Sequence, residues 1–337
     1  MQRQNIIAPY IPDETRYEKM QYRAVGKSGL KMSAISLGLW QNFGGYDNYE
    51  NCRAIVRHAF DLGITVFDLA NNYGPPIGAA EETMGRLMEE DMRPYRDEML
   101  ITTKAGYTMW PGPYGDWGSR KYLLASLDQS LKRMGLDYVD IFYHHRMDPN
   151  TPLEETMGAL ATAVKSGKAL YVGISNYSPE MAEKAVKILA GMGVHCLICQ
   201  SRYNMLDRGV ERLGLFKTAE KSGFGMTAFS PLAQGRLTGK YNHGIPEGSR
   251  ASGKSFFLNK DGITPELVNQ VSKLGEIAKK RGQTMAQMAL SWVLREKTMA
   301  SVLIGASSPE QLDENAKCLQ NLDFTSDELK AIDAIVG

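Results

Sequence analysis

The sequence predicts an α/β protein built as a single closed (β/α)8 TIM barrel. Eight strand-like segments alternate with segments of helical period along the chain. The strand-like segments are almost continuously apolar, which is typical of a parallel sheet covered on both faces. Eight such units in about 290 residues fit the usual size of this barrel, with room for insertions. We therefore expect residues 1–337 to form one domain.

The predicted strands are short and rich in β-branched and aromatic side chains. They occupy residues 34–40, 64–70, 99–105, 138–145, 169–175, 196–203, 224–230 and 301–307. Many of the intervening helical segments begin with Ser, Thr or Pro and end near Gly, as capped helices do. The clearest cover residues 51–63, 119–135, 152–167, 178–193 and 284–297.

Two further segments complete this arrangement. Residues 20–33 contain a KSG turn between short runs and predict an N-terminal hairpin that closes the bottom of the barrel. Residues 234–265 are rich in Gly, Lys and Ser and exceed an ordinary connection, which predicts a long functional loop over the top of the barrel. A doubly wound sheet is the alternative fold, but its G-x-G-x-x-G signature does not follow the first strand.

The composition favours a small-molecule partner over nucleic acid or a membrane. The 39 basic and 38 acidic residues nearly cancel, so no strong field attracts a polyanion. The N-terminus has no apolar signal-peptide region, and no later run is long enough for a membrane span. We expect a cytoplasmic protein.

The C-x-x-C pair formed by Cys196 and Cys199 suggests either a metal or redox pair or buried structural cysteines. In a regular strand, residues three apart point to opposite faces, so the thiols are expected to diverge rather than converge on one ion. No second C-x-x-C is present. We therefore expect structural cysteines and no metal site.

Three consecutive predicted strands end in ionisable side chains, where the active site of such a barrel lies. The second ends at Asp68, followed by Tyr73, and the third ends at Lys104. The fourth ends at His144 and His145, only one of which can face the interior. Asp, Lys and His are thus expected at one height on adjacent strands. A structural ion pair is the alternative, but burying both charges costs several kcal/mol per ion.

This combination fits the reduction of an aldehyde or ketone. An ammonium about 4 Å from a phenol contributes on the order of 4 kcal/mol at an effective dielectric constant of about 20. Before burial opposes it, Lys104 could therefore lower the pKa of Tyr73 by about two or three. Asp68 would keep Lys104 charged and oriented. Tyr73 could then give a proton to a carbonyl oxygen while hydride reaches its carbon.

In their order and context, Asp68, Tyr73, Lys104 and His145 resemble the catalytic tetrad of the aldo-keto reductases. In that family the histidine follows the strand's aspartate by five residues, which selects His145. The resemblance runs from about residue 22 to residue 333 and includes GITVFDLANNYG, GKALYVGISNYS, FSPLAQGRLTGKY and LIGASSPEQLDEN. Within the family, the motifs are most like those of bacterial L-glyceraldehyde 3-phosphate reductases and potassium-channel beta subunits.

The resemblance implies a bound NADP(H) and assigns its contacts. Residues at the strand ends would hold the nicotinamide, residues 230–240 and Arg250 the diphosphate, and residues 305–315 the adenosine end. The implied contacts are Gly38, Trp40, Asp68, Ser175, Asn176, Gln200, Phe229, Ser230, Pro231, Leu232, Ala233, Gly235, Lys240, Arg250, Gly305, Ser307, Gln311, Glu314 and Asn315.

The implied preference is for NADPH over NADH, because Ser307 and nearby helix amides suit a phosphate monoester. The chain departs here from many relatives, since ASSPEQLDEN contains no Lys or Arg and carries Asp313 and Glu314. Arg250 is the candidate to supply the missing charge.

The substrate contacts implied by position form an aromatic mouth beside the reacting groups. They are Trp40, Tyr73, Tyr107, Trp110, His145 and Arg146. Arg146 could meet an anionic group of the substrate, or it could pair with Asp148 on the rim.

The resemblance therefore implies an NADP-dependent reductase of small aldehydes, such as glyceraldehyde 3-phosphate or methylglyoxal. The alternative is a cofactor-sensing beta subunit bound to a partner protein. A metal-dependent hydrolase would need ligands on one face, which adjacent histidines do not provide. Relatives of this kind commonly form tetramers or octamers, so a homo-oligomer is expected.

Overall fold

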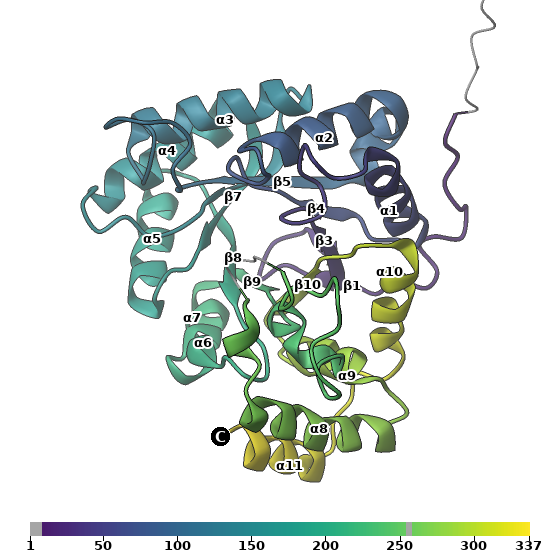
Figure 1. Cartoon of the computed structure of the whole chain (residues 1–337). Helices are drawn as coiled ribbons and strands as arrows, with labels where there is room; N and C mark the ends of the chain where they lie inside the picture. The colour runs from purple at the N-terminus through teal and green to yellow at the C-terminus, as the bar shows by residue number, and fades with distance from the viewer. Residues whose placement is uncertain (1–8, 254–257) are drawn as a thin grey trace, which may run out of the picture.

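The computed structural model describes residues 9–253 and 258–337. Its eight parallel strands close into a barrel in the order β10-β3-β4-β5-β6-β7-β8-β9, which confirms the predicted fold (Figure 1). Most strands are shorter than predicted, β7 has the predicted bounds, and β10 begins two residues earlier than predicted. They are β3 (Ile35–Gly38), β4 (Val66–Asp68), β5 (Leu100–Ala105), β6 (Val139–His144), β7 (Ala169–Ser175), β8 (Cys196–Arg202), β9 (Gly225–Phe229) and β10 (Met299–Ile304).

Helices surround this barrel and pack on its apolar outer face (Figure 1). They are α1 (Tyr49–Asp61), α2 (Ala79–Leu87), α3 (Arg120–Met134), α4 (Leu153–Lys165), α5 (Pro179–Gly191), α6 (Gly209–Arg212), α7 (Leu215–Ser222), α8 (Pro265–Lys280), α9 (Met285–Leu294), α10 (Pro309–Ala316) and α11 (Ser326–Val336). Side chains of Ser119, Ser178 and Thr284 accept backbone hydrogen bonds at the starts of α3, α5 and α9, as their positions predicted.

The predicted hairpin is present as β1 (Tyr22–Ala24) paired antiparallel with β2 (Lys31–Ser33). Val25 and Met32 of this hairpin join an apolar cluster with barrel residues that include Ile141 and Tyr143. The turn is fastened to the barrel by a 2.8 Å hydrogen bond from the Lys27 amide to the Gly223 carbonyl. The hairpin therefore closes the bottom of the barrel.

The long segment between β9 and α8 is organised around a small apolar cluster of its own. Tyr241, Ala251 and Leu258 are buried together in this cluster. Short 3-10 helices at Ala233–Thr238 and Lys260–Gly262 flank it. Part of the predicted loop, residues 254–257, lies outside the described residues.

The two cysteines of the C-x-x-C pair do not diverge as predicted. The pairing of β7 with β8 shifts register between Cys196 and Ile198, which indicates a bulge in β8. Leu197 and Ile198 both join the cluster at the bottom of the barrel, whereas Cys196 and Cys199 both belong to the larger core that includes the helices. Burial raises the pKa of the Cys199 thiol to about 11, so it remains a buried neutral thiol.

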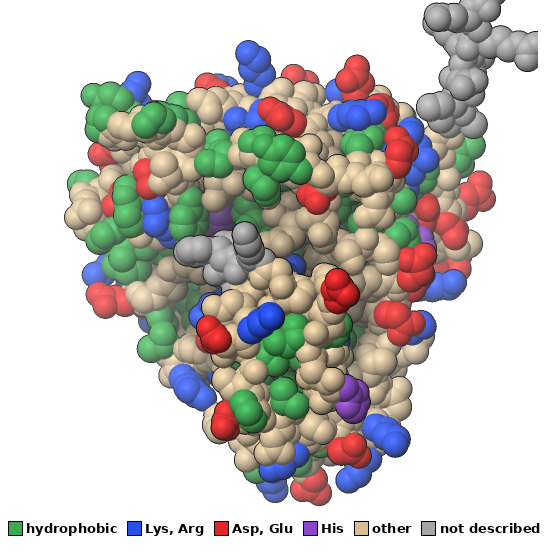
Figure 2. All heavy atoms as spheres, viewed as in Figure 1, with side chains coloured by type: hydrophobic (Ala, Val, Ile, Leu, Met, Phe, Trp, Pro, Cys, Tyr) green, Lys and Arg blue, Asp and Glu red, His purple; other side chains and the backbone are tan. Residues whose placement is uncertain are grey.

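Charged side chains of both signs are mixed over the face shown in Figure 2, in keeping with the nearly neutral composition. Across residues 9–253 and 258–337, no helix combines the length and apolar character needed to cross a bilayer.

The packing of the barrel interior can be tested at Gly173 in β7. A β-carbon there would lie 2.5 Å from the Tyr143 ring and 3.0 Å from Ile198. Gly173→Ala should lower the free energy of unfolding in urea by about 1–3 kcal/mol, because the filled interior cannot accept it. Gly275→Ala in α8 is the control, since a β-carbon there meets no heavy atom within 4 Å. Equal stability of the Gly173 variant and the wild type would contradict this packing.

Candidate active site

The strands bring Asp68, Lys104 and His145 to the same end of the barrel. Asp68 pairs with Thr102 of β5, and Lys104 pairs with Tyr143 of β6. Each successive member therefore lies two residues further along its strand. Strands of a closed barrel are tilted and staggered by its shear, and despite this register offset Tyr73 contacts both Lys104 and the His145 ring.

The centre of the site is a buried ion pair between Lys104 and Asp68. Lys104 Nζ donates to Asp68 Oδ2 and to the Leu69 carbonyl, each at 2.6 Å. It also donates to the Tyr73 hydroxyl at 3.2 Å. Lys104 is 0% exposed and Asp68 is 3% exposed, so solvent does little to weaken their attraction. The ammonium is thus fixed beside the phenol, as the sequence predicted.

Asp68 is oriented by two further side chains. Its other oxygen, Oδ1, accepts hydrogen bonds from Thr102 Oγ1 at 2.8 Å and from Gln200 Nε2 at 2.9 Å. Thr102 was not predicted, although it lies two residues before Lys104 and therefore faces the same side of its strand. Burial lowers the pKa of Lys104, but Asp68 and Tyr73 outweigh burial and the net pKa is raised. Lys104 is therefore charged at neutral pH.

The ionisation of Tyr73 differs from the sequence-based expectation. Burial has the largest influence and raises the pKa of Tyr73, and Asp68 raises it further. Lys104 lowers it, but not enough to bring the pKa below the usual value for a phenol. Without a ligand, Tyr73 is thus a protonated acid at neutral pH rather than a phenol close to ionising.

The two neighbouring histidines have separate environments. His144 Nδ1 lies 2.7 Å from the Tyr177 hydroxyl, and burial lowers the pKa of His144 to about 4. His145 comes directly after β6. Its ring packs edge-on against Tyr73 and Tyr107, with centroid distances of 6.0 and 4.7 Å. Burial and the charge of Lys104 hold the pKa of His145 well below its usual range. Both imidazoles are therefore neutral.

The predicted nicotinamide contacts lie together at the ends of β7 and β8. Asn176 Nδ2 donates to Ser175 Oγ at 3.1 Å and to the His145 carbonyl at 3.0 Å. Its backbone amide donates to the Gln200 carbonyl. Asn176 adopts a φ of 59°, a left-handed conformation that asparagine tolerates better than most residues. Amide and hydroxyl groups thus gather beside Asp68.

The loop after β9 has an unusual backbone and is lined by cations. Positive φ values occur at Ser230, Ala233, Gln234 and Gly235. Arg250 Nη1 donates to Gln234 Oε1 at 2.5 Å, and a β-carbon on Gly235 would lie 3.0 Å from Lys240 Nζ. Within the described residues, neither Lys240 nor Arg250 forms an ion pair with a carboxylate. The loop therefore offers positive charge that could receive a diphosphate.

The predicted adenosine contacts lie in α10 and in the residues just before it. Ser307 donates from its amide and hydroxyl to Gln311 Oε1, at 2.8 and 3.3 Å. Glu314 pairs with Lys317, and Asp313 lies 2.8 Å from His58. Gly305 is exposed and Asn315 is buried. The acidic side chains that argued against a phosphate here thus have basic neighbours.

The mouth of the barrel carries the predicted aromatic side chains. Trp40 lies 6.4 Å from Tyr73 between ring centroids, and Trp110 lies 5.3 Å from Tyr122. Phe229 ends β9, and Gly38 of β3 pairs with Asp68. Of these rings, Trp40 lies beside Tyr73, and Trp110 packs on Tyr122 of α3.

Arg146 does not pair with Asp148, which was one sequence-based alternative. It pairs with Asp116, at 2.8 Å from Nη2 to Oδ1. Asp148 instead accepts hydrogen bonds from the Gly118 amide and the Thr151 hydroxyl. The path of the loop between β5 and α3 decides this choice of partner.

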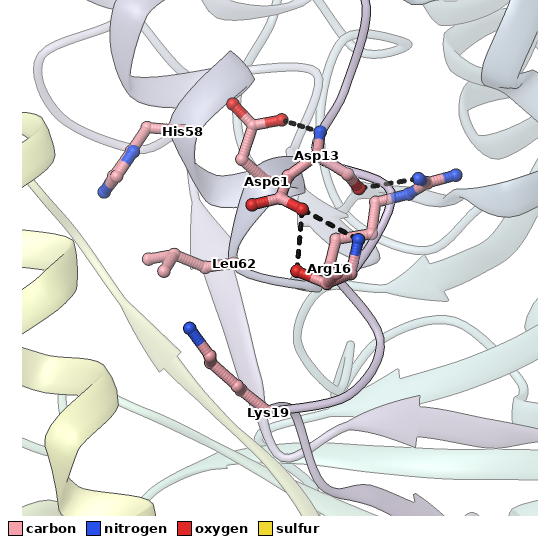
Figure 3. A pocket seen from close by; sticks show the side chains of 7 residues that line it. Asp13, Arg16, Lys19, His58, Asp61 and Leu62 are labelled. Atoms are coloured by element: carbon pink, nitrogen blue, oxygen red, sulfur yellow. Dashed lines mark hydrogen bonds between the residues drawn. The ribbon is translucent and has the colours of Figure 1, made fainter.

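A polar pocket of about 290 Å³ lies beside the end of α1 (Figure 3). Its lining includes Arg16, Lys19, His58 and Asp61. Asp61 Oδ1 accepts hydrogen bonds from Tyr10 and from the Asp13 amide. These contacts fasten the N-terminal segment to α1.

No group of three or more potential metal-ligating side chains occurs in the part of the chain that the structure describes.

Comparison with known proteins shows the family to which this chain belongs. The model of the Aldo/keto reductase family matches residues 34–336. The chain belongs to the aldo/keto reductase family. It is 59% identical over 329 residues to an L-glyceraldehyde 3-phosphate reductase from Escherichia coli O157:H7, covering 96% of this chain and 94% of that protein. The protein of the same name from Escherichia coli strain K12 matches with the same identity and coverage.

A more distant relative has a different description. A protein from Schizosaccharomyces pombe, described as a candidate beta subunit of a voltage-gated potassium channel, is 39% identical over 330 residues. The match covers 95% of this chain and 94% of that protein. As an aldo/keto reductase, the present chain is an oxidoreductase of a family that generally uses a nicotinamide cofactor.

Proposed function

We propose that this aldo/keto reductase reduces small aldehydes with NADPH, glyceraldehyde 3-phosphate or a methylglyoxal-like aldehyde being the substrate class. The observation that carries the proposal is the contact of Tyr73 with the charged, buried Lys104, beside the neutral His145. The 59% identity to proteins named L-glyceraldehyde 3-phosphate reductase supports this choice of substrate.

The residues present fit a dinucleotide. Lys240 and Arg250 beside the loop after β9, which form no ion pair among the described residues, suit a diphosphate, and the polar groups of Ser175, Asn176 and Gln200 suit a carboxamide. The remaining contacts implied by the family resemblance extend this proposal to the adenosine end. When bound, the reduced nicotinamide supplies a hydride.

The proposed roles of the side chains follow from their charge states. Tyr73 donates its proton to the oxygen of the substrate carbonyl, and Lys104 stabilises the tyrosinate that this transfer leaves behind. The neutral His145 can orient the carbonyl oxygen without competing as a strong acid.

Because reduction needs protonated Tyr73, the rate of aldehyde reduction should stay constant through neutral pH. The rate should fall as pH rises through the raised pKa of Tyr73.

The aromatic mouth would admit the substrate. Trp40, Tyr107 and Trp110 are the proposed walls, with Arg146 beside Tyr107. We also propose a homo-oligomer, a tetramer or an octamer, on the strength of the family resemblance.

A regulatory beta subunit that senses cofactor is the second candidate, and the 39% identical relative favours it. The geometry favours an enzyme, because a binding module does not need a phenol hydroxyl held 3.2 Å from a buried ammonium. Turnover by the purified chain separates these candidates.

Tyr73→Phe should lower kcat for aldehyde reduction by roughly 10²–10⁴-fold, because the proton donor is lost. The purified protein would be assayed by NADPH oxidation with a panel of phosphorylated and unphosphorylated aldehydes. NADPH affinity, measured by fluorescence, should stay the same. Tyr138→Phe is the control, since Tyr138 precedes β6 at the end of the strand away from His145, and within the described residues its hydroxyl makes only a 3.5 Å contact with Asp97. Full activity of the Tyr73 variant would contradict the assignment.

The cofactor preference gives a separate prediction. The Michaelis constant for NADPH should be lower than that for NADH, because Ser307 and the amides at the start of α10 suit a phosphate monoester. Ser307→Ala should narrow the difference between the two Michaelis constants by raising the Michaelis constant for NADPH alone. A clearly lower constant for NADH in the wild type would reverse the preference.

A further inference from the structure

Arg146 holds both ends of the loop that joins β5 to α3. Its Nε donates to the carbonyl of Gly106, the first residue of the loop, at 2.7 Å. Its Nη2 donates to Asp116 Oδ1, ten residues later, at 2.8 Å. The guanidinium fork therefore closes residues 106–116 against the end of β6. A lysine carries its three donors on a single nitrogen and could not reproduce the two bonds of this planar fork.

Two aromatic rings of the same loop lie against this guanidinium. Its central carbon is 4.2 Å from the Tyr107 ring centroid and 3.6 Å from that of Trp117. Trp117 has a φ of 69°, a conformation that costs free energy for a bulky side chain. The contact with Arg146 offsets this cost by a cation–π interaction.

Asp116 is the second fixed point of the loop. Its Oδ2 accepts a hydrogen bond from Thr108 Oγ1 at 2.6 Å, and its Oδ1 accepts one from the Trp117 amide at 2.6 Å. A turn within the loop is closed by a 2.8 Å bond from the Met109 amide to the Gly115 carbonyl. The Arg146–Asp116 pair therefore joins an ordered loop to the barrel.

Tyr107 transmits this arrangement to the active site. Its ring meets the His145 ring edge-on, with centroids 4.7 Å apart and an interplanar angle of 86°. The Tyr107 carbonyl also accepts a hydrogen bond from the Tyr122 hydroxyl of α3 at 2.5 Å. His145 Nδ1 has no hydrogen-bond partner among the described residues, so ring packing rather than a hydrogen bond at Nδ1 holds the imidazole.

We propose that Arg146 is a positioning residue that orients His145 through Tyr107 and does not bind an anionic group of the substrate. This inference rests on the proposed reductase function. Two of its three nitrogens already donate to the loop, and its guanidinium carbon lies over two rings. An anion ligand at this place would instead keep a free fork directed at the substrate.

The experiment compares glyceraldehyde 3-phosphate with unphosphorylated glyceraldehyde in the wild type and in Arg146→Ala, Arg146→Lys, Asp116→Ala and the Arg146→Ala/Asp116→Ala double variant. Positioning predicts that each single variant lowers kcat on the order of tenfold or more with both aldehydes. The ratio of the two kcat/KM values should stay within about threefold of the wild-type ratio, and the double variant should be little worse than either alanine variant.

A role as an anion ligand gives the opposite results. Arg146→Ala would then raise KM for the phosphorylated aldehyde alone, Arg146→Lys would retain part of that affinity, and Asp116→Ala would improve it by freeing the guanidinium. Any of these results would overturn the proposal. NADPH binding and thermal unfolding of each variant check that the protein is folded. If a variant does not fold, the milder Asp116→Asn is measured in its place. A wild type inactive with every aldehyde would refute the proposed function itself, whereas active wild type with unchanged variants refutes only the role of Arg146.

Discussion

The buried pair of Asp68 and Lys104 is the interaction on which this active site depends. Removing two charges from water costs several kcal/mol per ion, and an unpaired ammonium at this depth would lose its proton. Asp68 keeps it charged, and Thr102 and Gln200 hold the carboxylate in place. The barrel therefore maintains a cation beside the Tyr73 hydroxyl, where the proposed proton transfer would leave a tyrosinate.

The rest of the fold positions this charge. The shear of the barrel staggers Asp68, Lys104 and His145 along three neighbouring strands, and the loop after β4 returns Tyr73 to the ammonium. The hairpin closes the opposite end of the barrel, where an apolar cluster fills the interior. The loops after β5 and β9 supply Tyr107 beside His145 and the cations Lys240 and Arg250.

Much of this arrangement could be predicted from the sequence, because strand length, helix capping and ionisable strand ends are local signals. The bulge in β8 could not, since it depends on pairing with β7, and it brought Cys196 and Cys199 to one side. The net pKa of Tyr73 depends on burial, which only the packed structure sets. The partner of Arg146 likewise followed from the path of a loop that has no periodic pattern.

The most direct test of this account is a double-mutant cycle between Lys104→Met and Tyr73→Phe on kcat for aldehyde reduction. If Lys104 acts by stabilising the tyrosinate, its removal should cost orders of magnitude in the wild-type background and little in the Tyr73→Phe background. Equal losses in both backgrounds, with NADPH still bound, would show that Lys104 acts independently of the phenol and would contradict the account.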